Sequence, residues 1–144
     1  MEKGFKKMKV LGIDFGDARV GVATSDYGEN LATAQGTIKV SGINDAVQKV
    51  CEKAKELGAE KLIIGLPKNM DGSLSYRAER TQRFAEMLKE ATGLEYEFMD
   101  ERLSTMEAYR YLNATEFNGK KRRNVIDTLS AQIILQSWLD SKKK

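Results

Sequence analysis

The sequence has 144 residues and contains no histidine, a single cysteine, a single proline and a single tryptophan. The absence of histidine excludes a Ser-His-Asp triad, a histidine-ligated zinc and a histidine general base. Cys51 alone cannot form an intramolecular disulfide or a cysteine-rich metal site, and its surroundings are typical of a helix. Chemistry in this chain must therefore come from carboxylates, lysines, hydroxyl groups or one thiol.

Long apolar runs are also missing from the sequence. No run approaches the ~18 residues of a membrane span. Lys9 and Asp14 interrupt the only segment that could serve as the hydrophobic region of a signal peptide. We therefore expect a cytoplasmic protein with no membrane partner. The length, with a hydrophobic content of 41%, predicts one domain over residues 1–144 with a sizeable core.

Charge is unevenly distributed along the chain. The net charge of +3 comes from 24 basic and 21 acidic residues, which is too small to indicate a polyanionic partner by itself. The basic residues are concentrated after residue 119, where Lys120, Lys121, Arg122 and Arg123 follow one another. This run is typical of a loop that contacts phosphate, and equally of a solvated approach to a helix.

The hydrophobic pattern predicts a mixed α/β fold. Short apolar or alternating runs predict five strands, over residues 8–14, 19–25, 31–40, 62–66 and 94–100. The first two should form an antiparallel hairpin with Gly16 in the turn, and residues 62–66 a central parallel strand buried on both faces. Helical spacing predicts helices over residues 43–57, 76–91 and 124–141, with a short one beginning at Ser104. Right-handed βαβ crossovers then place helices on both faces of the sheet.

Two acidic residues follow predicted strands. Ligands of such sheets bind beyond the carboxyl ends of parallel strands. Asp14 ends the first strand, where a charge is costly unless it is paired, hydrogen-bonded or bound to metal; it could also be a turn-forming aspartate. Glu101 follows the last strand, and could instead be an exposed acid or the partner of Arg102.

A third acid lies on the apolar face of the last predicted helix. Ile134 and Trp138 lie 7 and 11 residues after Asp127, so the three share one face. Near the start of a helix, Asp127 could be favoured by the helix dipole, or it could complete a metal site with Asp14 and Glu101. Three converging carboxylates without histidine or thiolate favour Mg²⁺ or Mn²⁺, and two such ions roughly 4 Å apart suit phosphodiester hydrolysis.

The loop after the fourth predicted strand is a weaker candidate. Lys68 and Asn69, with neighbouring glycine, could hold phosphate, although a turn followed by a helix cap explains them as well. Neither G-x-x-x-x-G-K-[ST] nor G-x-G-x-x-G occurs, so neither familiar nucleotide-binding loop is supported.

Four segments in order resemble the YqgF family of Holliday-junction-resolvase-like nucleases, within the ribonuclease H-like superfamily. They are G-I-D-F-G-D-A-R-V-G-V-A (12–23), I-I-G-L-P-K-N-M-D-G-S (63–73), D-E-R-L-S-T (100–105) and K-K-R-R-N-V-I-D-T-L-S-A-Q-I-I-L-Q (120–136). The resemblance implies a ribonuclease H-like five-stranded sheet, with three antiparallel strands leading into parallel βαβ units. It also implies a metal-dependent nuclease of the bacterial cytoplasm, associated with maturation of the 5′ end of 16S ribosomal RNA in ribosome precursors, or with Holliday junction resolution.

The resemblance also assigns roles to residues. Asp14, Glu101 and Asp127 match the family's catalytic and metal-binding acids. Nucleic-acid contacts fall on Arg19, Lys68, Asn69, Arg102, Lys120, Lys121, Arg122 and Arg123. Asp17-Ala18 stands in the hairpin turn where the family often has a basic residue. Three matched acids are fewer than the four of many ribonuclease H-like enzymes, which leaves one or two bound ions as alternatives.

Several alternatives stay open. The protein could be a non-catalytic nucleic-acid-binding module that keeps the basic residues. Its hairpin also resembles the phosphate-binding hairpin of sugar kinases and actin-like ATPases, but those enzymes need two such domains. The sequence does not distinguish structured RNA from branched DNA. We expect a monomer or a weak homodimer.

Overall fold

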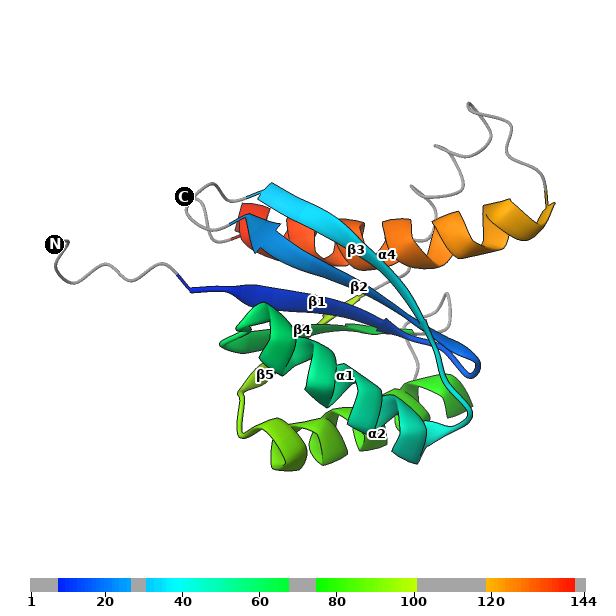
Figure 1. The fold of residues 1–144 in the computed structure, drawn as a ribbon, viewed down its shortest axis with the longest axis horizontal. Helices are drawn as coiled ribbons and strands as arrows, with labels where there is room; N and C mark the ends of the chain where they lie inside the picture. The colour runs from blue at the N-terminus through cyan, green and yellow to red at the C-terminus, as the bar shows by residue number, and fades with distance from the viewer. Residues whose placement is uncertain (1–7, 27–30, 68–74, 101–118, 142–144) are drawn as a thin grey trace, which may run out of the picture.

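A computed structural model describes residues 8–26, 31–67, 75–100 and 119–141; the side chains of residues 26 and 119–128 are not part of the description. Within these ranges the chain forms one five-stranded sheet with the strand order β3-β2-β1-β4-β5 (Figure 1). The strands are β1 (Val10–Phe15), β2 (Arg19–Asp26), β3 (Leu31–Lys39), β4 (Lys61–Leu66) and β5 (Tyr96–Asp100).

The first three strands form the predicted antiparallel unit. β1 pairs with β2, and β2 pairs with β3, with a register shift between Val22 and Ala23. In the turn between β1 and β2, the Gly16 amide donates to the Arg19 carbonyl oxygen over 2.9 Å. A side chain at Gly16 would lie 2.7 Å from that carbonyl oxygen, so the turn requires glycine. The hairpin prediction is therefore confirmed.

β4 and β5 continue the sheet as parallel strands. β4 lies between β1 and β5, and Leu62, Ile63 and Ile64 are completely buried, as expected for a strand covered on both faces. The prediction that this strand is central was inaccurate in one respect: the middle strand of the sheet is β1. The hydrophobic run of β4 indicates a strand that is buried on both faces. An interior strand that lies next to an edge strand is buried in this way as well as the middle strand.

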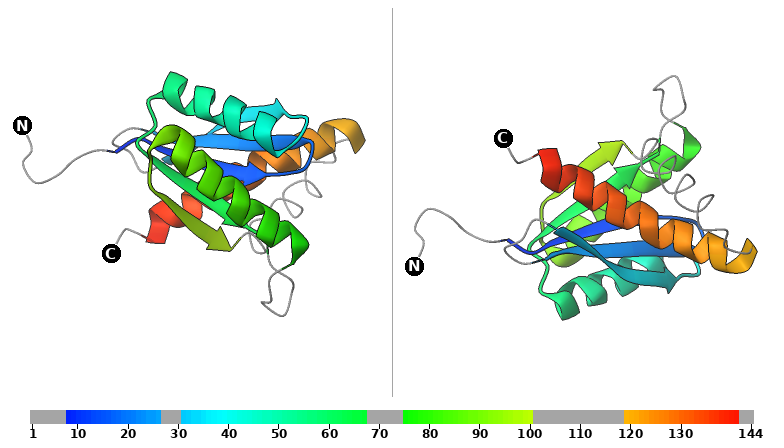
Figure 2. Two further views of the ribbon diagram at one scale, coloured as in Figure 1. Left: turned by 90° about the horizontal axis from the view of Figure 1, so that it is seen from below. Right: turned by 90° about the horizontal axis from the view of Figure 1, so that it is seen from above.

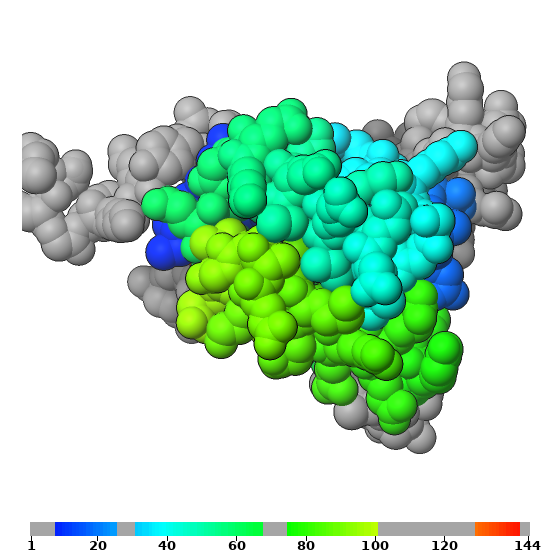
Figure 3. All heavy atoms as spheres, turned by 60° about the horizontal axis from the view of Figure 1, so that its bottom comes forward, coloured from blue at the N-terminus to red at the C-terminus, as the bar shows by residue number. Residues whose placement is uncertain are grey.

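Two helices cover one face of the sheet. α1 (Ile43–Leu57) and α2 (Tyr76–Thr92) end at Gly58 and Gly93, whose left-handed φ angles of 71° and 75° close the last turn. Figure 3 shows the two helices side by side over this face. Both helices were predicted from the sequence.

Among the described residues, one helix, α4 (Gly119–Ser141), crosses the other face (Figure 2). The side chains of β1 point alternately to the two faces of the sheet, and a hydrophobic cluster lies on each face. Leu11, Ile13 and Phe15 pack with α1 and α2. Val10 packs with α4 residues such as Ile134 and Leu135. Helices on both faces were expected, and the figures show them there. No helix in the described ranges is long and apolar enough to cross a membrane.

The start of α4 corrects the sequence prediction. The helix begins at Gly119 rather than at residue 124, so Lys120–Arg123 belong to its first turns and not to a loop. Asp127 is then the ninth residue of the helix, beyond the first turn in which the dipole acts. The dipole explanation for Asp127 is therefore weakened. The short helix predicted at Ser104 lies outside the described residues.

Candidate functional site

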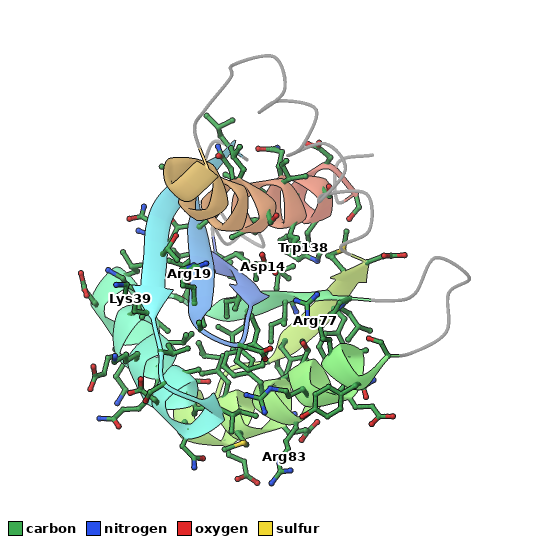
Figure 4. All side chains as sticks on the ribbon, turned by 90° about the vertical axis from the view of Figure 1, so that its right-hand side faces the viewer. Asp14, Arg19, Lys39, Arg77, Arg83 and Trp138 are labelled. Atoms are coloured by element: carbon green, nitrogen blue, oxygen red, sulfur yellow. The ribbon has the colours of Figure 1, made fainter. Side chains whose placement is uncertain are left out.

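Asp14 lies near the carboxyl end of the middle strand. It is the fifth residue of β1 and is half-buried, directly opposite Gly21 of β2. Ile13 and Phe15 point into the core beneath α1 and α2, so the alternation of the strand turns Asp14 toward α4. Figure 4 shows Asp14 on that side of the sheet, beneath α4. A carboxylate in this position borders a hydrophobic core without entering it.

Both strands beside Asp14 carry glycine at its level. Gly21 is its direct partner on β2. On β4, Ile64 pairs with Ile13, so Gly65 is the residue at the level of Asp14. Both glycines lie on the face that Asp14 occupies, because Ala23 and Ile63, two residues away from them, pack with α4. Glycine in a strand interior often marks a close approach by a ligand or backbone. Neither of the strand positions beside Asp14 therefore carries a side chain of its own.

α4 is seated on β1 through a third glycine. A side chain at Gly12 would place its Cβ atom 2.7 Å from Leu135 Cβ and 3.1 Å from the Ala131 carbonyl oxygen. At the other end of this contact, Trp138 and Leu139 share a cluster with Val10. Residue numbers therefore fall along α4 as they rise along β1, and the helix runs antiparallel to the strand.

This packing fixes the direction in which position 127 lies. Four residues of helix and two residues of strand each span about 6 Å. One turn back from Ala131 along α4, and two residues on from Gly12 along β1, lead to Asp127 and Asp14. The Asp127 side chain itself is outside the described part of the structure.

β5 presents two of its residues to α4. Trp138 Nε1 donates to Glu97 Oε1 over 2.9 Å, and Lys61 Nζ lies 3.1 Å from Glu97 Oε2. Met99 packs with the same cluster, whereas Tyr96 and Phe98 pack with the core beneath α1 and α2. By alternation Asp100, the last residue of β5, is on the face opposite Asp14. Asp100 therefore does not join Asp14.

The other predicted site residues divide into two groups. Arg19 is half-buried on β2 and lies on the Asp14 face, as Figure 4 shows. Glu101, Arg102, Lys68 and Asn69 lie outside the described residues, and only the backbone of Lys120–Arg123 is described. Among the side chains that the structure describes, no three acidic or thiol groups cluster as metal ligands. Two of the three predicted ligands are not among those side chains.

Contacts with α2 hold the β1–β2 turn beside Asp14. Arg80 Nε lies 3.2 Å from Asp17 Oδ1, and the Arg80 guanidinium lies 5.8 Å from the centroid of the Phe15 ring. Phe15 in turn stacks on Phe84 of α2, with ring centroids 4.3 Å apart. Asp17, which occupies a turn position where a basic residue was expected, is thus an ion-pair partner of α2.

Sequence reasoning missed three residues of this region. Gly21 and Gly65 occur within predicted strands, where strand glycine is the available signal, but which residues flank Asp14 depends on strand register. Lys39 was also missed: it is exposed and directly opposite Arg19. Figure 4 shows Lys39 and Arg19 on neighbouring strands.

Comparison with known proteins gives close relatives. Residues 8–141 match the family described as RuvX: Holliday junction resolvase. A relative from Caldanaerobacter subterraneus subsp. tengcongensis is 42% identical over 137 residues, or 94% of this chain and 99% of the relative. A relative from Bacillus cytotoxicus is 45% identical over 139 residues, or 94% of this chain and 100% of the relative. Both carry the name "Putative pre-16S rRNA nuclease".

Solved structures share the fold at low sequence identity. T. thermophilus RuvC in complex with a Holliday junction substrate has a TM-score of 0.60 and 14% identity, covering 94% of this chain and 95% of RuvC. Fowlpox virus resolvase with junction DNA has a TM-score of 0.58 and 9% identity, covering 95% of this chain and 100% of the resolvase. With the observed strand order, these likenesses confirm the predicted ribonuclease H-like fold.

Proposed function

Since this chain belongs to the RuvX family of Holliday junction resolvases, we propose that it is a divalent-metal-dependent endonuclease whose substrate is the 5′-extended precursor of 16S ribosomal RNA. The family membership confirms the resemblance carried by the four sequence segments. The RNA substrate follows from the names of the two relatives, which align over nearly their full lengths. Cleavage of an RNA precursor and resolution of a Holliday junction share one reaction, the hydrolysis of a phosphodiester bond.

The observation that carries the proposal is the setting of Asp14. Its carboxylate is half-buried at the carboxyl edge of the sheet, and both strand positions beside it are glycines. The Gly12 contact with α4 supports an approach of Asp127 from above. β5 supports Glu101 rather than Asp100 as the third acid, because Glu97 and Met99 face α4 and one further step of two residues leads to Glu101.

The donor set fits a hard divalent cation. Asp14 offers carboxylate oxygen, Glu101 and Asp127 would add two more carboxylates, and the chain has no histidine to offer. Oxygen ligands of this kind favour Mg²⁺ or Mn²⁺, as one or two ions. When bound, the cation supplies Lewis acidity for the attack of water on phosphorus. In this assignment Asp14 holds the cation, Arg102 holds the phosphate that is cut, and Arg19 contacts the neighbouring backbone.

The basic residues support a nucleic-acid partner. The first turns of α4 carry Lys120, Lys121, Arg122 and Arg123, and Arg19 lies beside Asp14 on the sheet. Contacts of lysine and arginine with phosphate position a nucleic acid without reading its sequence. β4 ends at the same edge, and Lys68 and Asn69, which follow it in the sequence, are assigned to the same role.

Branched DNA is the second candidate substrate. It is favoured by the family description, which names Holliday junction resolution. A third candidate, a binding module without catalysis, would need the same basic residues but not the acids. The three candidates differ in what is cut and in whether the acids matter.

The test compares Asp14→Asn with the wild type on three substrates: a 5′-extended 16S RNA fragment, a four-way DNA junction and a linear DNA duplex. We expect cleavage of the RNA in Mg²⁺ or Mn²⁺, and a loss of about a hundredfold or more in Asp14→Asn, because a held cation contributes several kcal/mol. Binding should survive the substitution. Glu52→Gln is the matched control, since Glu52 is exposed on α1, on the other face of the sheet, and its substitution should leave cleavage intact.

Each outcome selects a candidate. Cleavage of the junction alone would transfer the same site to branched DNA. Binding of either substrate without cleavage in any divalent metal would favour the non-catalytic module. Equal cleavage by the wild type and Asp14→Asn would remove Asp14 from the catalytic site.

Three further features belong to this proposal. Residues 1–144 are proposed to form one nuclease domain, which the family match over residues 8–141 supports. A role in ribosomal RNA maturation places the protein in the bacterial cytoplasm with ribosome precursors as partners. We propose a monomer or weak homodimer, which light scattering over a range of concentrations would test.

A further inference from the structure

Two cationic side chains stand directly opposite each other on β2 and β3. The register pairs Arg19 with Lys39, and the neighbouring Ala18–Val40 pair is hydrogen-bonded, since the Val40 amide donates to the Ala18 carbonyl oxygen over 3.0 Å. Hydrogen-bonded and non-hydrogen-bonded pairs alternate in an antiparallel ladder. Arg19 and Lys39 are therefore a non-hydrogen-bonded pair, whose Cα atoms are only about 4.5 Å apart.

Both cations belong to the face that carries Asp14. Val20 and Ile38, the next pair along the ladder, pack with the core beneath α1 and α2, so Arg19 and Lys39 turn toward the α4 side. Figure 4 shows Lys39, Arg19 and Asp14 in that order across β3, β2 and β1. The acid and the two cations thus form one row at the same edge of the sheet.

The backbone at Lys39 is held in place from two sides. The Val40 amide ties the end of β3 to the β1–β2 turn at Ala18. From α1, Lys49 Nζ donates to the Lys39 carbonyl oxygen over 2.9 Å, and Lys49 is itself 3.2 Å from Asp45 Oδ2. The base of the Lys39 side chain is therefore fixed relative to Asp14, as a positioning residue requires.

The placement of these charges opposes stability. Like charges directly opposite each other in a sheet repel, and basic residues in the first turns of a helix oppose its dipole. Lys120–Arg123 belong to the first turns of α4, which extend past the ends of the strands in Figure 1. A polyanion that contacts Arg19 and Lys39 would reduce the repulsion between them.

We propose that Arg19 and Lys39 form a phosphate clamp that holds the substrate strand on the β2–β3 side of Asp14. This inference rests on the proposed nuclease function and deepens it by giving the path of the strand. β3 lies about 10 Å from β1, a distance that roughly three nucleotides of a stacked strand cover at 3.4 Å each. The clamp binds backbone phosphate beside the scissile bond and reads no base.

The test measures binding of the 5′-extended RNA fragment by fluorescence anisotropy in EDTA, over a series of salt concentrations. Each phosphate contact contributes about 0.7 to the slope of log affinity against log salt for a single strand. Lys39→Ala should reduce the slope by about that amount, and Lys39→Arg should restore it. In cleavage assays Lys39→Ala should raise KM with little change in kcat, as expected for a group that positions substrate.

Matched controls separate the clamp from a general effect of charge. Lys55 is exposed in the last turn of α1, and Arg83 is exposed on α2 and points away from the sheet in Figure 4. Lys55→Ala and Arg83→Ala remove the same charge and should keep the wild-type slope. Lys39 is exposed, so its substitution should leave the fold intact, which circular dichroism checks.

An unchanged slope in Lys39→Ala, with salt-dependent binding by the wild type, would overturn the clamp. So would a decrease of the slope in Lys55→Ala as large as the decrease in Lys39→Ala. These results leave the nuclease proposal standing, provided that the wild type cuts and Asp14→Asn does not. Failure of the wild type to bind or cut either substrate would overturn both.

Discussion

Gly12→Ala adds one methyl group at the closest approach between β1 and α4. The new Cβ atom would lie 2.7 Å from Leu135 Cβ, whereas ordinary contact begins near 3.4 Å. The two elements must separate by about 0.7 Å, the difference between these distances. Neither neighbour can yield by rotating, since one is a Cβ atom and the other, 3.1 Å away, is the Ala131 carbonyl oxygen.

The expected cost has two parts. Overpacking of this kind destabilises by about 1–3 kcal/mol, which at a typical slope lowers the urea midpoint by about 1 M. Displacement of α4 also moves Asp127 relative to Asp14, and a shift near 1 Å can reduce catalysis by about a hundredfold. Cleavage should therefore fall about tenfold or more at temperatures where the variant is fully folded.

Leu135→Ala provides the control for this reasoning. Alanine keeps the Cβ atom, so the double variant with Gly12→Ala should be no more stable than Leu135→Ala alone. If the collision involved the outer leucine atoms, Leu135→Ala would relieve it. The double variant would then be more stable than Leu135→Ala alone. Wild-type stability and cleavage in Gly12→Ala would refute the close seating of α4 on β1.

Two further predictions concern stability alone. Phe84→Ala removes a fully buried ring that stacks on Phe15, and should lower the free energy of unfolding in urea by about 3–5 kcal/mol. The control Arg83→Ala, at the neighbouring position, should change it by less than about 0.5 kcal/mol. A cost for Phe84→Ala near that of Arg83→Ala would contradict the packing. The Tyr96 hydroxyl donates to Glu86 Oε2 over 2.6 Å, and this hydrogen bond, with burial, raises the pKa of Tyr96 to about 12. Its stabilisation should be present below pH ~10, the pKa of an unfolded tyrosine, and be lost as the pH rises from there through about 12. Urea midpoints over this range should fall more steeply for the wild type than for Tyr96→Phe, and parallel curves would contradict the assignment.

Much of the fold was predictable because its signals are local. α1 and α2 combine helical spacing of apolar residues with a glycine that ends each helix, at Gly58 and Gly93. The first hairpin has two apolar runs around Gly16, and β4 is a short run bounded by charge and proline. Each of these signals is contained within some 15 residues, so no knowledge of the tertiary structure was needed.

The start of α4 was missed because the apolar signal begins late. Residues 119–123 are Gly-Lys-Lys-Arg-Arg, which offers no apolar period, and the available signal was Asn118, a residue type that favours the N-cap position. The first apolar residues, Val125 and Ile126, come later, and a pattern-based prediction begins near them. The basic run consequently looked like a loop.

The surroundings of Asp14 were missed for a different reason. Gly21, Gly65 and Lys39 acquire their meaning only from strand register: Gly21 opposes Asp14, Ile64 opposes Ile13, and Lys39 opposes Arg19. Register depends on pairing between segments far apart in the chain, and a slip of one residue would turn every side chain to the other face. The residues that surround the acid are therefore harder to predict than the acid itself.

Register also bears on the choice of Glu101 over its neighbour Asp100. Asp100 and Glu101 are adjacent, and either could follow a strand into a metal site. The Trp138–Glu97 hydrogen bond and the packing of Met99 establish which face the odd-numbered residues of β5 occupy, and Asp14 occupies the same one. Because Gly65 lies opposite Met99 and at the level of Asp14, Asp100 is one residue beyond that level but on the other face. The role proposed for Glu101 requires only that the same alternation continue by one residue, whereas Asp100 would need a twist of the strand that its pairing with Leu66 opposes.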